Sequence, residues 1–505
     1  MQITRKLIVS NTVWSAFAQG SVMLINLLVL PLFITNLGAD LYGIWVLSNV
    51  VLGYLNVFDL GFTQGLQKYV AEARVKENCR ELSEVVVTGF GLLVMIGVFL
   101  AMLVYREASA VVAFFNIQVD QQAIAIELLQ ISAIFCVVMW PLRIVDVVLS
   151  ATLRIKELSF LTAFKNIAQS VTMLVMILCA YDVIVIKWAT SVVLFASSLY
   201  GVILLKRYMP EVVWRPLNFK FGQLLRMQRF SLGMFYAGLI GLLHIQIDTL
   251  IIGKFLSMSA VTAYVIAAKP FQMVQQIGGL LMRAVTPASY TLGAQQDLER
   301  LASLVTLGVR GRSLVVMPIC FVAFACITDF ILLWVGEDYF SAIIWAQVFL
   351  LVPILGCLGV GAHVCKGVGE VGLVNNFTTA KIALNLVTSI MLIPHFGIGG
   401  PILGTVISSI VLGDVVALQV YCRRVGVPSR GAYGFFARVL AVSIVAFLIS
   451  YFALLLLASR EPSYVTFLIK VTVAILTQVA CHLLFSLTQL EQKKIIVYVK
   501  GLFIV

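Results

Sequence analysis

Fourteen mostly apolar stretches follow one another along this 505-residue chain, and each is long enough to cross a membrane. A crossing helix needs about 20 apolar residues. The composition agrees, because 61% of the residues are hydrophobic and only 11% are charged. A soluble protein could not bury that much apolar surface, since most of its surface must face water. Helix is the expected state because lipid offers no partner for backbone groups. The sequence therefore predicts an all-α, polytopic membrane protein.

The predicted spans have approximate bounds. They are 12–35, 41–67, 84–105, 120–141, 159–180, 183–205, 230–253, 259–283, 303–328, 341–365, 374–394, 401–421, 434–457 and 463–488. The first span carries Asn26 and Pro31 and lacks a following small-residue cleavage site, so we interpret it as a true span and not a signal peptide.

Positive charges alternate between the connections of these spans. Twenty-seven of the 35 Lys and Arg residues fall on the terminal segments and even-numbered connections. The opposite side carries Arg106, Lys187, Lys254 and Arg460. Cytoplasmic loops are the ones enriched in Lys and Arg, so both termini are predicted to be cytoplasmic. The net charge of +12 then mainly reports topology, and no soluble face gathers it for nucleic-acid binding.

The longest cytoplasmic connection, 206–229, contains two prolines and six basic residues and suggests a boundary between two lobes. A weak repeat supports two halves, because LGADLYGIW at 37–45 and LSMSAVTAY at 256–264 share a pattern. The predicted organisation is an N-lobe of six spans (1–206), the connection (207–229), a C-lobe of six spans (230–424), and two additional helices with the tail (425–505).

Polar side chains form stripes inside several spans, because residues spaced by three or four share a helix face. Such stripes should face each other or water, since lipid is costly for them. We expect a wet cavity between the lobes, whereas the alternative is that small polar residues only join helices. The stripes comprise Asn11, Ser15, Gln19 and Asn26; Trp45, Asn49, Asn56, Asp59, Thr63 and Gln67; Thr162, Lys165, Gln169 and Thr172; Thr262, Lys269, Gln272, Gln276 and Arg283; and Thr378, Lys381, Asn385 and Thr388.

Lys269 is the strongest candidate for a cavity cation, because it enters near the middle of its span, where its ammonium cannot easily reach an interface. Lys165 and Lys381 enter closer to the cytoplasmic side, so snorkelling competes with a functional role. The candidate cavity residues are Lys269, Lys381, Lys165, Arg283, Gln272, Gln276, Asn26 and Asn56.

Two carboxylates are candidates for coupling or release. Asp248 could pair with Lys269 in an empty cavity or carry a proton, and its alternative is a structural partner for Lys254. Asp59 lies near the cytoplasmic end of its span, where a capping role is the alternative. Asp414 and His363 stand isolated in the sequence and receive no role.

Enzyme motifs are missing from the sequence. It has no phosphate-cradling glycine loop, no H-E-x-x-H pattern and no serine nucleophile elbow. Four scattered histidines and nine unpatterned cysteines argue against a metal site or a disulfide framework. We therefore predict no catalytic residue, no metal and no cofactor.

Three segments carry a resemblance to a known family. They are LPLFITNLGADLYGIWVLSNVVLGYLNVFDLGFTQGLQKYVAEAR (30–74), with the D-x-G of Asp59 and Gly61, DTLIIGKFLSMSAVTAYVIAAKP (248–270) and PHFGIGGPILGTVIS (394–408). In order and spacing the chain resembles Wzx-type polysaccharide flippases of the multidrug/oligosaccharidyl-lipid/polysaccharide (MOP) superfamily. The turn at 256–259 lacks the Gly-Pro common in that family.

The resemblance implies a bacterial inner-membrane protein that flips an undecaprenyl-diphosphate-linked oligosaccharide from the cytoplasmic to the periplasmic leaflet. It implies membrane lipids as surroundings and a polysaccharide polymerase and a chain-length regulator as further partners. A diphosphate would be the anion that Lys269 meets. Alternatives are an ion-coupled drug exporter of the same superfamily, a flippase for the peptidoglycan precursor lipid II, and a membrane glycosyltransferase or polymerase.

Overall fold

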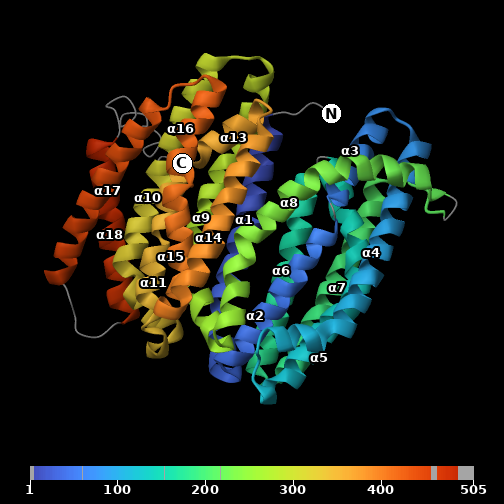
Figure 1. Cartoon of the computed structure of the whole chain (residues 1–505), viewed down its shortest axis with the longest axis horizontal. Coiled ribbons are helices and arrows are strands. Elements are labelled where there is room, and N and C mark those ends of the chain that lie inside the picture. The colour runs from blue at the N-terminus through green and yellow to red at the C-terminus, as the bar shows by residue number, and fades with distance from the viewer. Residues whose placement is uncertain (1–4, 60, 153, 216–217, 457–462, 487–505) are drawn as a thin grey trace, which may run out of the picture. The chain divides into compact units, whose positions relative to one another are not determined.

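The computed structural model describes residues 5–59, 61–152, 154–215, 218–456 and 463–486 (Figure 1). Within these ranges the regular structure is helical and contains no strand, which confirms the all-α prediction. Eleven helical stretches among the described residues are long and apolar enough to cross a membrane. The protein is therefore a multi-pass membrane protein.

Two compact units divide the chain, Met1–Thr262 and Ala263–Val505. The division falls inside α9, whereas the sequence predicted a lobe boundary at 207–229. The helices of the first unit are α1 (Arg5–Leu37), α2 (Ala39–Tyr54), η1 (Leu55–Asp59), α3 (Phe62–Val75), α4 (Cys79–Phe114), α5 (Val119–Ala151), α6 (Ile155–Leu178), α7 (Val183–Tyr208) and α8 (Phe221–Phe255).

The second unit contains all but the first turn or so of α9 and every helix that follows. These helices are α9 (Met258–Ala294), α10 (Leu298–Val335), η3 (Glu337–Tyr339), α11 (Ala342–Phe349), α12 (Leu351–Leu355), η4 (Gly356–Gly359), α13 (Val360–Gly367), α14 (Val371–Phe396), α15 (Gly399–Val411), α16 (Asp414–Val425), α17 (Arg430–Leu456) and α18 (Tyr464–Phe485).

Eleven of the fourteen predicted spans coincide with the candidate membrane helices. The other three are 41–67, 230–253 and 259–283, and they correspond to α2 to α3, α8 and α9. The helices α8 and α9 are continuous, with 35 and 37 residues, so each is long enough to cross a bilayer. The count of fourteen spans and the cytoplasmic termini remain predictions.

The predicted span 41–67 is wrong as one continuous helix. α2 ends at Tyr54, and α3 begins only at Phe62, after the short 3-10 segment η1. Gly61 has a φ of 71°, in the left-handed region that favours glycine. The Asp59 carboxylate accepts hydrogen bonds from the backbone N–H and the hydroxyl of Thr63, at 3.2 and 2.7 Å. These contacts stabilise the start of α3, because the aspartate satisfies an N–H group of its first turn.

Two predicted spans of the second unit are also interrupted. The stretch 342–367 comprises α11, α12, η4 and α13, and the stretch 399–425 breaks between α15 and α16. At this second break, a Cβ on Gly413 would lie 2.0 Å from the Ser409 carbonyl oxygen. Because Gly413 has no Cβ, its backbone can lie this close to the Ser409 carbonyl group. Interrupted helices in membranes are tolerated where protein or water surrounds them.

The last two helices, α17 and α18, pack on α10 within the second unit (Figure 1). Lys470 of α18 forms a 2.6 Å salt bridge with Asp329 of α10, and Gln478 of α18 donates to the Ser443 carbonyl of α17 at 3.0 Å. Leu468, on the other hand, is 62% exposed, as expected for a side chain facing lipid. Polar contacts thus fix the additional helices to the unit.

Candidate functional site

The polar stripe of α9 is the most open one among the described residues. Lys269 is half-buried, and Gln272 and Gln276 are exposed. Within the described part of the chain, no hydrogen bond or salt bridge is found to any of these three side chains. Thr262, at the other end of the stripe, donates to the Ala39 carbonyl at 2.6 Å. The side chain of Arg283, also on α9, lies outside the described residues.

Lys269 has no carboxylate beside it among the residues that the structure describes. A cation at membrane depth without a counter-charge is costly, so such a group normally faces water, a polar guest or an opposite charge. The amides of Gln272 and Gln276 lie on the same helix face as Lys269.

Lys381 of α14 is half-buried. None of the described carboxylates forms a direct salt bridge with Lys381. Further along α14, Asn385 is buried and donates to Thr405 of α15 at 2.7 Å. The α14 stripe thus includes one hydrogen-bonded amide, that of Asn385, and one ammonium without a described salt bridge, that of Lys381.

Arg312 and Asp414 approach each other beside η4. A Cβ on Gly359 would lie 3.0 Å from Asp414 Oδ2 and 3.2 Å from Arg312 Nη1, so glycine leaves the room that both groups need. Arg312 also reaches Gln275 of α9, with Nη2 3.5 Å from Oε1. Nearby, the Thr286 hydroxyl of α9 and His363 Nδ1 of α13 are 2.8 Å apart. The residues Arg312, Asp414 and His363 carried no predicted role.

Two of the three predicted cavity residues of the first unit have partners inside that unit. Lys165 forms a 3.3 Å salt bridge with Asp146 of α5. Asn26 Oδ1 accepts from the Ser170 hydroxyl of α6 at 3.3 Å. The backbone of Asn56 belongs to η1, but its side chain lies outside the described residues. These contacts favour helix–helix adhesion for Lys165 and Asn26, while their predicted role in binding stays a prediction.

Lys187 was expected in an outer connection, yet it lies in α7 and is only 5% exposed. Its ammonium is 3.3 Å from Asn49 Oδ1 and 4.8 Å from the centre of the Trp45 ring, both on α2. A cation above an indole face is an attractive arrangement. In the sequence, this contact was indicated by the spacing of Trp45 and Asn49, which places both on one face of a helix.

The two candidate coupling carboxylates occupy different surroundings. Asp248 of α8 is 7% exposed. Lys254, its alternative partner, donates instead to the Phe114 carbonyl at 2.6 Å. Asp248 belongs to one compact unit and Lys269 to the other, so their pairing stays a prediction. Asp59 caps α3, and its coupling role is likewise untested.

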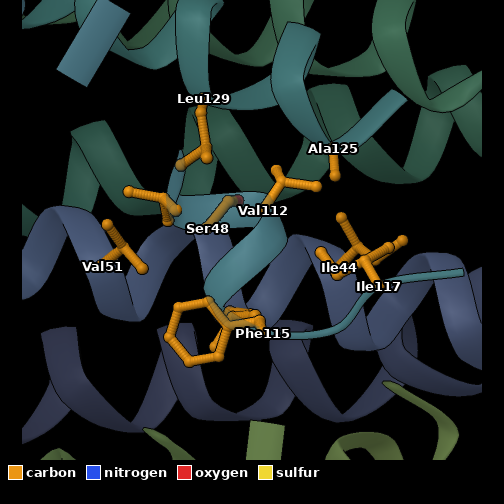
Figure 2. Close-up of a pocket in the computed structure, with 10 residues that line it drawn as sticks. Ile44, Ser48, Val51, Val112, Phe115, Ile117, Ala125 and Leu129 are labelled. Carbon is orange, nitrogen blue, oxygen red and sulfur yellow. The ribbon is translucent and has the colours of Figure 1, made fainter. Parts of the chain in front are cut away.

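A small pocket of the first unit lies between α2, the end of α4 and the start of α5 (Figure 2). Its lining is apolar apart from Ser48, whose hydroxyl donates to the Trp45 carbonyl at 2.8 Å. The cavity volume is about 10 Å³, close to the minimum for one water molecule. This pocket is too small and too apolar to receive a glycan or a diphosphate.

No group of three or more His, Cys, Asp or Glu side chains that could hold a metal ion occurs among the described residues. The chemistry available here consists of cations, amides and hydroxyls in membrane helices. It can bind and release a polar, anionic guest without forming or breaking a covalent bond.

Solved structures with a similar fold define the class of protein. The fold is similar to that of the lipid II flippase MurJ in an inward closed conformation, with a TM-score of 0.76, 12% identity, and coverage of 94% of this chain and 98% of that one. It is also similar to an inward-facing multidrug resistance MATE family transporter of the MOP superfamily, with a TM-score of 0.69, 15% identity, and coverage of 80% and 94%. The protein thus has the fold of MOP-superfamily flippases and exporters.

Residues 37–344 match the polysaccharide biosynthesis protein family, and the chain belongs to that family. It is 21% identical over 336 residues to a putative O-antigen transporter of Shigella flexneri, covering 66% of this chain and 78% of that protein. The predicted resemblance to polysaccharide flippases of the MOP superfamily is confirmed.

Proposed function

We propose that this protein flips an undecaprenyl-diphosphate-linked oligosaccharide from the cytoplasmic to the periplasmic leaflet of the bacterial inner membrane. The family match and the similarity to a putative O-antigen transporter support a glycan as cargo. The similarity to a lipid II flippase supports a fold able to handle a lipid-linked sugar.

The observation that carries this proposal is the ammonium of Lys269 on α9, which forms no salt bridge or hydrogen bond with any described residue. A diphosphate supplies several negative oxygens, and charge-assisted hydrogen bonds to it are stronger than neutral ones. In surroundings of lowered dielectric, the attraction exceeds its value in water. The exposed amides of Gln272 and Gln276 beside it can donate to and accept from sugar hydroxyls. One helix face thus offers contacts for both parts of the headgroup.

The proposed mechanism is alternating access through a cationic cavity in a protein of fourteen spans with cytoplasmic termini. Basic residues near the cytoplasmic ends of the spans, together with Lys165, Lys381 and Arg283, attract the diphosphate. Asp248 assists its release by competing for Lys269, and the lipid tail stays in hydrocarbon throughout. A polysaccharide polymerase and a chain-length regulator would act on the product.

The test is flipping of undecaprenyl-diphosphate-linked oligosaccharide in proteoliposomes that contain the purified protein. Lys269→Ala should abolish flipping, whereas Lys76→Ala, at an exposed lysine after α3, should match the wild type. Both variants should reach the membrane in equal amounts. Normal flipping by Lys269→Ala would refute the role of this site.

A second candidate is a flippase for lipid II, since the fold is similar to MurJ over 94% of this chain. The same proteoliposomes loaded with lipid II distinguish the two functions. Faster flipping of lipid II than of the oligosaccharide carrier would favour this alternative. Extrusion of cationic dyes without any lipid flipping would instead favour a drug exporter.

A further inference from the structure

The connection between α7 and α8 is held against α4 by hydrogen bonds within the first unit. The backbone N–H of Val213 donates to the Ser83 hydroxyl at 3.0 Å, and the backbone N–H of Lys220 donates to the Thr88 hydroxyl at 3.0 Å. Both hydroxyl-bearing residues are buried in α4. The described residues of 209–220, which we call the strap, therefore lie along α4 in a fixed position.

The strap reaches the apolar part of α4. The first turns of this helix, 79–84, contain three charged residues, whereas 85–105 contain none. The Phe219 ring packs beside Gly91, where an added Cβ would lie 3.0 Å from two ring carbons. At about 1.5 Å per residue, this contact is roughly 10 Å beyond the last charge of those first turns. Non-helical backbone at such a depth needs partners inside the protein, and the hydroxyls of α4 supply them.

The exposed side of the strap combines aromatic rings with cations. Trp214 is 41% exposed, Phe219 is 38% exposed, and Phe221, which begins α8, is 64% exposed. Arg215 and Lys220 are exposed next to them, and neither forms a salt bridge with a described residue. Aromatic rings are enriched at the level of lipid headgroups, and basic side chains there are attracted to anionic lipids. The exposed side of the strap therefore suits a membrane interface.

A neighbouring cation has a different, structural environment. Arg226 Nη1 of α8 lies 3.1 Å from Glu81 Oε1, and its guanidinium is 4.7 Å from the centre of the Tyr69 ring. Arg226 therefore joins α8 to α3 and α4. The strap and the last turn of α7 have no such balance of charge, because they contain one acidic residue, Glu211, and four exposed basic ones: Lys206, Arg207, Arg215 and Lys220.

We propose that the strap is a docking surface for the headgroups of anionic phospholipids. The rings of Trp214 and Phe219 lie at the boundary between headgroups and acyl chains, and Arg215 and Lys220 bind the lipid phosphates. The excess of positive charge complements an anionic headgroup, and the depth of the strap along α4 favours a lipid over a protein partner. Such binding is the same whichever cargo the protein carries, so it goes beyond the proposed function.

The first experiment titrates phosphatidylglycerol and phosphatidylethanolamine into the full-length protein in detergent and measures bound lipid by native mass spectrometry. Arg215→Gln combined with Lys220→Gln should weaken the tightest phosphatidylglycerol binding about tenfold, because two cations no longer attract the headgroup. Binding of phosphatidylethanolamine should not change. The charge-conserving pair Arg215→Lys and Lys220→Arg should bind as the wild type does.

The matched control removes two exposed cations of the first unit outside the strap, with Lys76→Gln and Arg80→Gln combined. It should bind phosphatidylglycerol as the wild type does, and size-exclusion chromatography and thermal unfolding would establish that every variant is folded. Unchanged phosphatidylglycerol binding by the folded variant at positions 215 and 220, or an equal loss in the control, would overturn the proposal.

The second experiment locates the strap by the fluorescence of Trp214 in liposomes. The difference between the wild type and Trp214→Phe isolates the emission of this residue, since phenylalanine keeps an aromatic ring against Phe90, whose centre lies 5.5 Å away. Phospholipids brominated on their acyl chains should quench this emission more strongly than iodide in the water does. Quenching by iodide alone would show that the strap faces water, which would refute lipid docking and favour a protein partner.

Discussion

Two polar stripes with the same helical spacing have opposite surroundings in this protein. The stripe of α2, η1 and α3 is closed by contacts within the first unit: Lys187 meets Trp45 and Asn49, Asp59 binds Thr63, and Gln67 donates to Ser150 at 2.7 Å. The stripe of α9 is open at Lys269, Gln272 and Gln276 among the described residues. A polar stripe therefore shows that side chains avoid lipid, but not what they face instead.

The difference follows from what the neighbouring helices present. Opposite α2 and α3 stand a hydroxyl on α5 and an ammonium on α7, and each reaches a partner of matching length. Such polar contacts between membrane helices stabilise packing by modest amounts. The α9 side chains are long, and a static helix–helix contact would need partners that the described residues do not supply. Open stripes thus point to a guest, and closed stripes point to folding.

Among the substitutions that test this difference between the two stripes, Lys269→Gln should change transport the most. A hydrogen bond to a charged group contributes about 1.5–3 kcal/mol, so flipping should fall roughly 10- to 150-fold while thermal stability is unchanged. Initial rates in proteoliposomes and unfolding in detergent would measure the two quantities. Loss of stability without a specific loss of flipping would place Lys269 among the structural residues.

The next effect concerns Asp59→Ala on the closed stripe. Losing this cap should lower the free energy of unfolding by about 0.5–2 kcal/mol, because the Thr63 N–H loses its acceptor. Flipping per folded molecule should match the wild type, and Asp59→Ser should recover part of the stability. If Asp59→Ala instead stopped flipping at full stability, the carboxylate would act in coupling, as the sequence had suggested, and the stripe would not be purely structural.

The sequence predicted the membrane helices better than it predicted the breaks between them. Long apolar runs identified eleven candidate membrane helices, because length and hydropathy are properties of a single segment. The predicted span 41–67 did not include the break before α3, because the prediction followed the apolar run. The D-x-G motif of Asp59 and Gly61, which lies at the break, was visible in the sequence. Helix breaks depend on such short-range hydrogen bonds, which hydropathy does not report.

The candidate site was predictable only where one helix carries it. The α9 stripe follows from helical spacing alone, and the structure leaves Lys269 without a described partner, as a free cation requires. By contrast, Arg312 of α10 and Asp414 of α16 approach each other beside Gly359 from helices far apart in sequence. Neither residue received a role from the sequence, because nothing local in a sequence shows which distant charges meet.

A smaller effect should follow from Gln67→Leu on the closed stripe. The change removes the hydrogen bond to Ser150 between α3 and α5 and should lower the free energy of unfolding by about 0.5–1.5 kcal/mol. Ser150→Ala should cost a similar amount, and the double variant should cost less than the sum, because both changes remove one contact. Simple additivity would show that the two side chains do not cooperate.

The smallest effect should come from Gln276→Leu on α9. This side chain has no partner within the described residues, so its loss should leave the unfolding temperature unchanged. If its amide binds sugar hydroxyls, the apparent affinity for the lipid-linked oligosaccharide should fall about three- to tenfold, as expected for one neutral hydrogen bond. Binding of undecaprenyl diphosphate without sugar should not change, which separates the amide from Lys269. An equal loss for both ligands would show that Gln276 acts through the charge of its neighbour, and the open stripe would then be one cation site without a separate region for the glycan.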